Sequence, residues 1–250
     1  MQTQRLKRGS LITLAGTLLP PSVFAALQRL NQWEWHPIDW LEAAPAQPLS
    51  VVATTLTEDI DALDLPGKRI LIGHSAGGVL AQAVATQLAQ PLDGLILLCT
   101  GAEASHHGDP DAPQRLLQNG LDSFLTPFFN RCFGAAFCAL PEAQPLLHYC
   151  RLYALGFDAK DIAPAMTSLR LWDLRSQLSA ISCPTLILYG EDDPARGMAD
   201  ANVMAAGIPN AHIVALPSGH TPMVTHQEQF LESLLPFLNQ VFRTSKTAAA

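Results

Sequence analysis

The sequence has no long apolar run and few basic residues. None of its apolar stretches reaches the roughly 18 residues that a membrane-spanning helix needs, so we expect no membrane span. Acidic residues outnumber basic ones by 22 to 15, and the formal net charge is -7. Because a nucleic-acid surface needs clustered Lys and Arg, nucleic acid is not an expected partner.

Charged residues are also scarce, at 15% of the chain, whereas apolar residues make up 48%. This balance predicts one large buried core and restricts disorder to the chain ends, with a disordered tail over residues 244–250. A chain of 250 residues suits one compact domain with room for an inserted cap.

The cysteines fit neither a disulfide framework nor a zinc site. They are five, an odd number, and no two follow the CxxC spacing. We therefore expect reduced, mostly buried thiols in a cytoplasmic protein, and no metal. The five are Cys99, Cys132, Cys138, Cys150 and Cys183.

The N-terminus resembles a secretory signal in part. Basic residues precede an apolar stretch over residues 11–19, and residues 23–25 resemble a signal-peptidase site. The competing interpretation makes residues 11–15 a buried first strand and residues 16–18 the loop after it. Cleavage would remove both, and the catalytic site predicted from the rest of the chain needs that loop. We therefore expect a cytoplasmic protein that retains this stretch.

Apolar strand-like runs alternate with helix-like segments along most of the chain. The alternation predicts an α/β fold, with a mostly parallel sheet covered by helices on both faces. The clearest strand-like runs are residues 10–15, 69–73, 94–99, 185–189 and 212–216, with a weaker one at 35–39. The helix-like stretches are residues 21–31, 57–63, 77–89, 197–206 and 227–242.

The block of residues 101–183 breaks this alternation, because it has helical patterning and no convincing strand. A connection of that length inside a compact domain is usually functional. We expect a helical cap or lid over a core formed by residues 1–100 and 184–243; the alternative is a set of extra helices packed on the sheet. The helical segments of the block are residues 116–125, 127–137, 143–155 and 161–171.

The strongest motif is the sequence GHSAGG at residues 73–78, between a strand-like run and a helix rich in small residues. A GxSxG pattern in that context is typical of a serine nucleophile on a tight, strained turn. The turn leaves no room for side chains two positions from the serine, which explains Gly73 and Gly77. The helix N-terminus adds free N–H groups and partial positive charge near an oxyanion. We predict Ser75 as the nucleophile.

A serine hydroxyl needs a base and an acid partner to act as a nucleophile. An acidic turn, Glu191-Asp192-Asp193, follows one strand-like run, and His220 follows the next one along the chain. The carboxyl ends of parallel strands lie at one edge of the sheet, where open α/β sheets hold their sites. The pattern therefore predicts that an acid of this turn and His220 meet Ser75 at that edge.

On these motifs the chain resembles the α/β-hydrolase superfamily over nearly its whole length. The family order of nucleophile, acid and histidine is the order found here. The resemblance implies Asp193 as the acid, because the family's acid usually stands three residues after the glycine of the acidic turn; Glu191 and Asp192 are the alternates. The family's Gly-His motif matches Gly219-His220.

The other histidines near these motifs receive different roles. His226 stands where the final helix begins, which favours a surface position. His74 corresponds to a position that is commonly a packing residue in the family. His106 and His107 could serve as ligands, but two adjacent histidines in a polar loop are more often solvated.

The resemblance also implies an oxyanion hole made of two main-chain donors. One is the N–H of Ala76, directly after the nucleophile. The other comes from the loop after the first strand, where position favours Thr17 with Leu18 as the alternate. Many relatives carry His-Gly in this loop, and this chain has Ala15-Gly16. Main-chain donors tolerate that replacement.

These residues predict a serine hydrolase that cleaves a carboxylic ester or thioester. His220 takes the proton of Ser75 as the serine attacks an acyl carbonyl, Asp193 orients the imidazole, and water then releases the acid from an acyl-enzyme. No metal or organic cofactor is implied. One alternative is a lyase or C–C bond hydrolase that uses the same triad. The other is a non-catalytic small-molecule binding protein, which would not require an intact triad.

The substrate is less closely defined. We expect a small-molecule acyl substrate and name Leu18, Phe128 and Phe129 as substrate-binding candidates, although aromatic residues of the block are more often its own core. The segment Asp173-Leu174-Arg175 weakly resembles both pimeloyl-carrier-protein methyl ester esterases and menaquinone-pathway lyases of this fold. A carrier-linked substrate would suit cationic residues on the block, but a mixed solvated surface is the favoured interpretation. Those cations are Arg115, Arg131, Arg151, Lys160 and Arg170.

Overall fold

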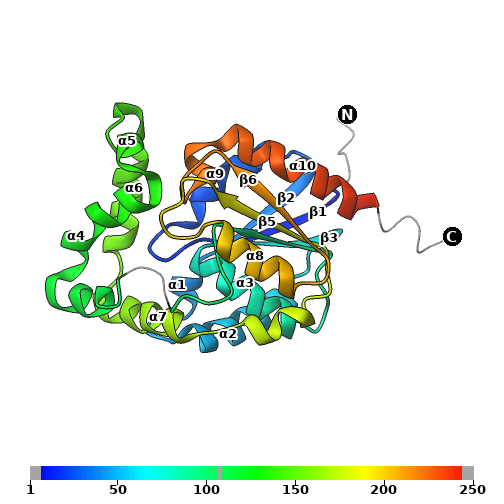
Figure 1. Cartoon of the computed structure of the whole chain (residues 1–250), viewed down its shortest axis with the longest axis horizontal. Coiled ribbons are helices and arrows are strands. Elements are labelled where there is room, and N and C mark those ends of the chain that lie inside the picture. Colours follow the sequence, from blue (N-terminus) through cyan, green and yellow to red (C-terminus); the bar gives the residue numbers. More distant parts are fainter. Residues whose placement is uncertain (1–6, 106–108, 244–250) are drawn as a thin grey trace.

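The computed structural model describes residues 7–105 and 109–243. Within these ranges the chain forms a parallel sheet of six strands in the order β2-β1-β3-β4-β5-β6 (Figure 1). The tail expected at 244–250 and the pair His106-His107 lie outside the described residues. The strands are β1 (Gly9–Leu14), β2 (Trp33–Ile38), β3 (Lys68–His74), β4 (Gly94–Leu98), β5 (Thr185–Gly190) and β6 (Ala211–Leu216).

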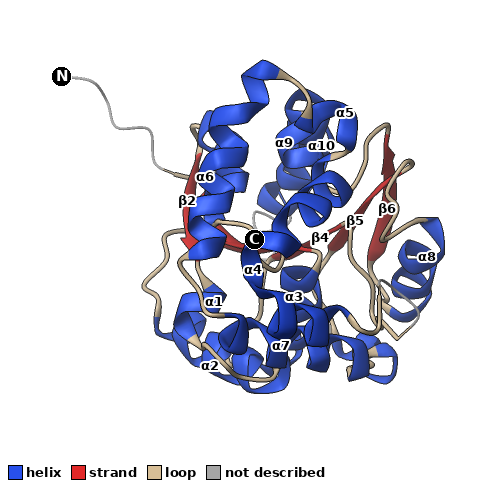
Figure 2. Ribbon diagram, turned by 90° about the vertical axis from the view of Figure 1, so that its left-hand side faces the viewer, coloured by secondary structure: helices blue, strands red, loops and turns tan. Residues whose placement is uncertain are grey.

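Helices cover both faces of this sheet, which confirms the predicted fold class (Figure 2). The helices α2 (Leu49–Ala62) and α3 (Ala76–Gln87) pack on one face, and α3 contacts β1, β3 and β4. The 3-10 helix η1 (Pro21–Arg29) and α10 (Gln227–Arg243) pack on the other face. The remaining elements around the sheet are α1 (Trp40–Ala43), α8 (Met198–Gly207) and α9 (Pro222–Thr225).

The central strands are buried, and their register brings their carboxyl ends into line. β1 and β4 are buried along their whole length, as the near-continuous apolar runs predict. Leu14 of β1 pairs with Gly73 of β3, and Leu98 of β4 pairs with Leu188 of β5. Residues that follow these strands therefore meet at one edge of the sheet, which we call the carboxyl edge.

Two predicted helices differ from the observed ones. The stretch predicted at 57–63 belongs to α2, which begins at Leu49. Its first turns contain β-branched residues of low helix propensity, but Val52 and Leu56 are fully buried, and burial outweighs propensity here. The stretch predicted at 21–31 is a 3-10 helix, with the Val23 N–H donating to the Pro20 carbonyl oxygen at 3.1 Å.

The helical block of residues 101–183 contains α4 (Ala112–Phe133), α5 (Ala135–Cys138), α6 (Gln144–Leu155) and α7 (Ala159–Leu171). The helices α4, α5 and α6 stand beside the sheet as an arm, and α7 returns to pack on α2 (Figure 1). The 3-10 helix η3 (Arg175–Ala180) then leads into β5. Among all the helices described, none combines the length and apolarity of a membrane span.

The helix breaks in this block fall at glycines. Gly120 kinks α4 with a φ of 76°, and Gly134 separates α4 from α5 with a φ of 84°. We predicted separate helices at 116–125 and 127–137, but Pro127 lies inside α4. One missing N–H donor is tolerated there, whereas the two positive φ angles end the regular helix.

Candidate active site

Ser75 stands on the turn between β3 and α3, at the carboxyl edge. Its φ of 54° and ψ of -119° lie outside the conformations that L-residues usually adopt. A Cβ at Gly73 would overlap the backbone of Gly77, and a Cβ at Gly77 would overlap the carbonyl oxygen of Leu14. The glycine spacing of the motif therefore follows from close packing of the turn on itself and on β1.

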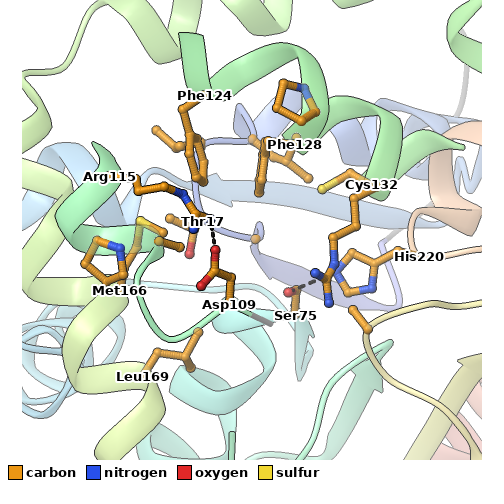
Figure 3. A pocket seen from close by; sticks show the side chains of 18 of the residues that line it. Thr17, Ser75, Asp109, Arg115, Phe124, Phe128, Cys132, Met166, Leu169 and His220 are labelled. Atoms are coloured by element: carbon orange, nitrogen blue, oxygen red, sulfur yellow. Dashed lines mark hydrogen bonds and ion pairs between the residues drawn. The ribbon is translucent and has the colours of Figure 1, made fainter. Parts of the chain in front are cut away.

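Hydrogen bonds hold this strained turn in place. The Ser75 N–H donates to the carbonyl oxygen of Leu98 at 3.1 Å. The hydroxyl of Thr100 donates to the Ser75 carbonyl oxygen at 2.7 Å, and the Gly78 N–H donates to the same oxygen at 2.9 Å. With its main chain fixed, the serine presents Oγ to the cavity above the sheet (Figure 3).

The structure joins Ser75, His220 and Asp193 in one hydrogen-bonded chain. His220 Nε2 lies 3.0 Å from Ser75 Oγ, and His220 Nδ1 lies 2.7 Å from Asp193 Oδ2. The side chains of His220 and Asp193 are both buried. The alternates Glu191 and Asp192 are exposed, so Asp193 is the acid of the turn that contacts the histidine.

Hydrogen bonds keep Asp193 charged in spite of its burial. Burial alone raises the pKa of this carboxyl group, but the bonds from His220 and from the main-chain N–H groups of Ala195 and Arg196 outweigh it. The pKa of Asp193 therefore lies below its usual value. A charged Asp193 favours the His220 tautomer with the proton on Nδ1, which leaves Nε2 free to accept the Ser75 proton.

His74, next to the nucleophile, contacts both the base and the loop after β1. Its Nε2–H donates to the main-chain oxygen of His220 at 2.8 Å. Gly16 packs against the opposite edge of the ring, where Nδ1 has no hydrogen-bond partner among the described residues. Burial, and then the neighbouring His220, lower the pKa of His74 to about 3, so its ring is neutral. His74 is thus a packing residue that also supports the base.

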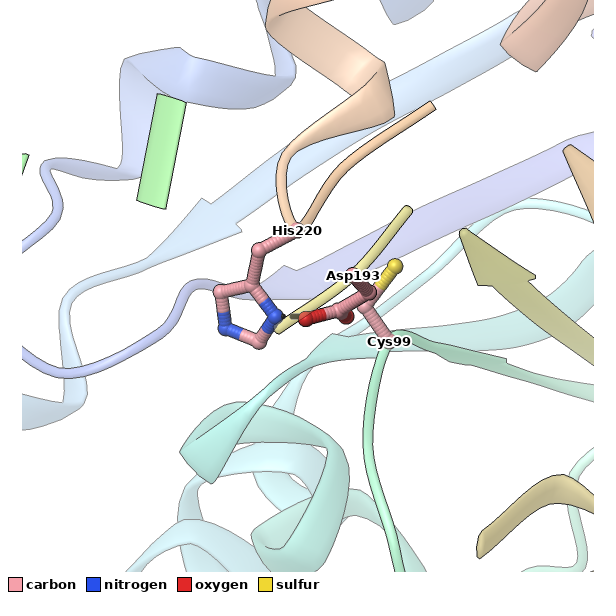
Figure 4. A group of neighbouring side chains, drawn as sticks. All are labelled: Cys99, Asp193 and His220. Carbon is pink, nitrogen blue, oxygen red and sulfur yellow. Dashed lines mark hydrogen bonds and ion pairs between the residues drawn. The ribbon is translucent and has the colours of Figure 1, made fainter. Parts of the chain in front are cut away.

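Cys99 packs against the acid and the base (Figure 4). Its Sγ and one ligand atom each of Asp193 and His220 lie within 4.8 Å of one another. A metal would need a thiolate at this position, but burial first, and then the charge of Asp193, raise the pKa of the Cys99 thiol well above its usual value. The group therefore fits a protonated thiol beside the triad better than a set of metal ligands.

The loop after β1 has a fixed shape close to Ser75. The indole N–H of Trp40 donates to the carbonyl oxygen of Ala15 at 2.7 Å. The Leu19 N–H donates to the Gly16 carbonyl oxygen at 3.2 Å, and Leu18 between them has a φ of 60°. These contacts make a tight turn whose main chain is ordered before any ligand binds.

Two main-chain donors predicted for an oxyanion hole border this site. Thr17 lines the cavity together with Ser75, and a Cβ on neighbouring Gly16 would lie 3.2 Å from Ser75 Cβ. Ala76 follows Ser75 as the first residue of α3. Neither the Thr17 N–H nor the Ala76 N–H donates to another main-chain group in the described part of the chain. Both are free to donate to a ligand oxygen.

A cavity of about 420 Å³ opens above Ser75. Leu18 and Phe128 line it, but Phe129 does not: its ring packs 5.8 Å from those of Phe128 and Phe133, inside the helical block. Phe124, Phe128 and Arg131 follow the i, i+4, i+7 spacing of one helix face, and Phe129 lies beside that face, buried in the core. Met166 and Leu169 of α7 belong to the wall and were not predicted (Figure 3). The larger apolar side chains of the wall are Leu18, Leu19, Phe124, Phe128, Met166 and Leu169.

Charged side chains also reach this cavity. Three of them, Arg115, Arg131 and Arg170, are among the cations noted in the sequence, and Figure 3 shows Arg115 paired with Asp109. Arg196 was not predicted, although it follows Asp193 by only three residues in the same loop. That short spacing is the signal that could have identified it.

Comparisons with known proteins agree with this geometry. The model of the alpha/beta hydrolase family matches residues 11–233. Polyketide synthase ThaQ of Burkholderia thailandensis is 28% identical over 95% of this chain, which spans only 12% of the length of ThaQ. A pimeloyl-acyl-carrier protein methyl ester esterase of Shewanella oneidensis is 27% identical over 92% of this chain and 91% of that protein.

The fold of a solved esterase is similar as well. The esterase EaEST of Exiguobacterium antarcticum superposes with a TM-score of 0.80 at 21% identity, over 93% of this chain and 92% of that one. At this identity the likeness concerns the fold alone. The family match, however, runs from β1 to α10 and includes the serine turn. The chain therefore belongs to the alpha/beta hydrolase family.

Proposed function

We propose that this chain hydrolyses carboxylic esters or thioesters through an acyl-enzyme on Ser75. The observation that carries the proposal is the hydrogen-bonded chain from Ser75 through His220 to Asp193 beneath a largely apolar cavity. A serine hydroxyl backed by a histidine and a buried carboxylate is the arrangement that acyl transfer requires.

The proposed reaction has two halves. In the first, His220 Nε2 takes the proton from Ser75 Oγ as the oxygen attacks the acyl carbon, and the histidine then gives that proton to the departing alcohol or thiol. In the second, His220 takes a proton from water, which attacks the acyl-enzyme, and Ser75 regains its proton as the acid leaves. Asp193 stabilises the imidazolium in both halves. The N–H groups of Thr17 and Ala76 donate to the oxyanion.

The helical block acts in this proposal as a cap over the core formed by residues 1–100 and 184–243. Support comes from the cavity wall, which joins α4 and α7 of the block to the Thr17 loop and Ser75 of the core. Leu18 and Phe128 would contact the acyl chain across this junction. Excluding water from such a cavity strengthens the hydrogen bonds to the oxyanion.

We propose a small-molecule acyl ester as the basic substrate and extend the proposal to acyl chains linked to a carrier protein. The Shewanella relative is named for a methyl ester on an acyl-carrier protein, and its similarity covers both chains almost fully. The cavity is of a size that holds a medium-length acyl chain.

We also place the protein in the cytoplasm. Residues 11–19 form most of β1 and the loop beside Ser75, which supports their retention in the mature chain. The five cysteines are free thiols and most of them are buried, which fits a reducing compartment. Cell fractionation with an antibody against the chain tests this placement.

The test of the activity uses a fluorophosphonate probe and a series of p-nitrophenyl esters of increasing acyl length. Wild type should label at Ser75 and hydrolyse the esters, and Ser75→Ala and His220→Ala should lose turnover. Ser233→Ala is the matched control, because the Ser233 hydroxyl bonds within its own helix, to the Phe230 carbonyl oxygen, and Ser233 is not among the lining residues of the cavity. Folded wild type that neither labels nor hydrolyses any ester would contradict the proposal and favour the lyase or binding alternatives.

A further inference from the structure

The cavity above Ser75 is lined by several arginines, although the chain as a whole is acidic. The chain has 22 acidic and 15 basic residues, yet four of its eleven arginines line this one cavity. Among the described lining residues, Asp109 is the sole carboxylate. An apolar acyl chain gives no reason for this arrangement, because charge near an apolar wall costs free energy unless it is paired.

Three of the four arginines have partners within the protein itself, and one of them is Arg170, which donates to the Ser105 main-chain oxygen at 2.9 Å. Arg115 forms an ion pair with Asp109 across the cavity mouth (Figure 3). Arg196 is buried, lies 3.5 Å from an oxygen of Asp200, and donates to the main-chain oxygen of Glu103 at 3.3 Å. These three guanidinium groups need no ligand to satisfy them.

Arg131 differs from these three. Its side chain is exposed, and it forms no ion pair with any residue of the described ranges. The main chain beside it is anchored, because the hydroxyl of Thr221 donates to the main-chain oxygen of Cys132 at 2.9 Å. Thr221 follows His220 directly, so this bond ties the end of α4 to the catalytic base. An unbalanced cation thus borders the cavity, and its chain neighbour Cys132 is bonded to the residue that follows the base.

We propose that the cavity is built for an anionic substrate, and that Arg131 binds a carboxylate or phosphate group of the ester or thioester next to Ser75. The inference rests on the proposed function and narrows its substrate class. The anionic group belongs either to the acyl part or to the leaving group, and the guanidinium pairs with both in the same way. The positive cavity also offsets the repulsion that the acidic surface exerts on an anion.

The first experiment compares esters that differ only in charge. p-Nitrophenyl hydrogen adipate and p-nitrophenyl hexanoate test a carboxylate on the acyl part. 4-Hexanoyloxybenzoate and its methyl ester test a carboxylate on the leaving group. At least one anionic ester should have a higher kcat/KM than its neutral partner, and that preference should shrink as salt is added.

The second experiment tests Arg131 itself. Arg131→Gln should lower the ratio of anionic to neutral kcat/KM roughly tenfold, as expected for the loss of a hydrogen-bonded charge pair. Arg131→Lys should restore part of the ratio because it keeps the charge. Arg151→Gln is the matched control: Arg151 lies on α6, bonds to Asp122 at 2.6 Å and is not among the lining residues.

The outcomes separate this inference from the proposed function. The anionic site is overturned if both members of each pair have equal kcat/KM. It is also overturned if Arg131→Gln leaves the ratio of anionic to neutral kcat/KM unchanged. In both cases the proposed ester hydrolysis still stands. If wild type hydrolyses no ester, calorimetric titration of Ser75→Ala with the same pairs decides the question. Tighter binding of an anionic member that depends on Arg131 supports the site, and equal binding overturns it.

Discussion

The carboxyl edge of the sheet and the helical block face each other across one cavity, but they are held in different ways. At the edge, Ser75 is fixed by a main-chain bond to β4 and by glycines that admit no side chain, and the side chains of His220 and Asp193 are buried. The arm formed by α4, α5 and α6 instead exposes apolar side chains such as Tyr149 and Leu152, which are 52% and 56% exposed.

Side-chain hydrogen bonds link the block to the core. The hydroxyl of Tyr153 donates to an Asp39 carboxylate oxygen at 2.8 Å, and Thr221 donates to Cys132 near the base. Positive φ angles at Gly120 and Gly134 interrupt the arm. The proposed function assigns the chemistry to the edge and the selection of the substrate to the block. Substitutions at the edge should therefore lower kcat, and those in the block should change KM.

The largest effect is expected at the edge, from Asp193→Asn. The asparagine keeps the shape of the site but cannot stabilise the imidazolium, so kcat should fall by about 10⁴. Steady-state kinetics on a p-nitrophenyl ester measures the loss, with circular dichroism to verify the fold. Asp192→Asn, at the exposed neighbouring acid, is the control and should retain activity. If Asp192→Asn lowered kcat more than Asp193→Asn, the assignment of Asp193 as the acid would be wrong.

A second comparison places the same substitution in both regions. Gly77→Ala puts a Cβ into the Leu14 carbonyl oxygen and should lower the free energy of unfolding by about 3 kcal/mol. Gly134→Ala meets open space and bears only the cost of backbone angles that favour glycine, φ 84° and ψ 138°, about 1–3 kcal/mol. Urea unfolding of both variants measures the difference. Equal costs would show that the block is packed as tightly as the edge.

The same contrast explains what the sequence could predict. The strands, the serine turn, the acidic turn and His220 were all predicted, because each follows from local rules: apolar runs, glycine spacing and the alignment of parallel strand ends. These rules apply at the edge, where backbone geometry sets the position of every functional group.

In the helical block such rules are weaker. Phe129 was predicted to bind substrate beside Phe128, but the rotation of α4 turns it into the block's own core. A break was predicted before Pro127, whereas the helix bends at Gly120. Arg196 was missed although it follows Asp193 closely, and its burial depends on contacts with Asp200 and with the Glu103 main chain. Tertiary packing, rather than propensity, decides these positions.

A smaller effect concerns the pH dependence of stability through His74. Its pKa is about 3 in the folded protein, below the ordinary value near 6.5. Below pH 6.5 His74 therefore binds a proton in the unfolded chain but stays neutral in the folded one. The free energy of unfolding consequently decreases as the pH falls towards 3. The loss amounts to at most about 1.4 kcal/mol per pH unit.

His74→Gln tests this linkage, because its side-chain amide can still donate to the His220 carbonyl oxygen but does not titrate. Urea unfolding between pH 7 and pH 4.5 should show a steeper loss for wild type than for the variant. The difference between the two curves isolates His74, since every other titrating group is shared. Parallel curves would mean that His74 is protonated in the folded protein and that the site tolerates its charge.

The smallest effect belongs to the block and concerns binding. Phe128→Ala removes apolar wall opposite Ser75 and should raise the KM for a long-chain p-nitrophenyl ester about fivefold, or about 1 kcal/mol, with kcat nearly unchanged. A short acetate ester should be much less affected, since it does not reach the ring. Leu152→Ala, on the exposed face of α6, is the matched control. If Phe128→Ala instead lowered kcat for both esters alike, the block would take part in the chemistry, and the division of roles between the two regions would fail.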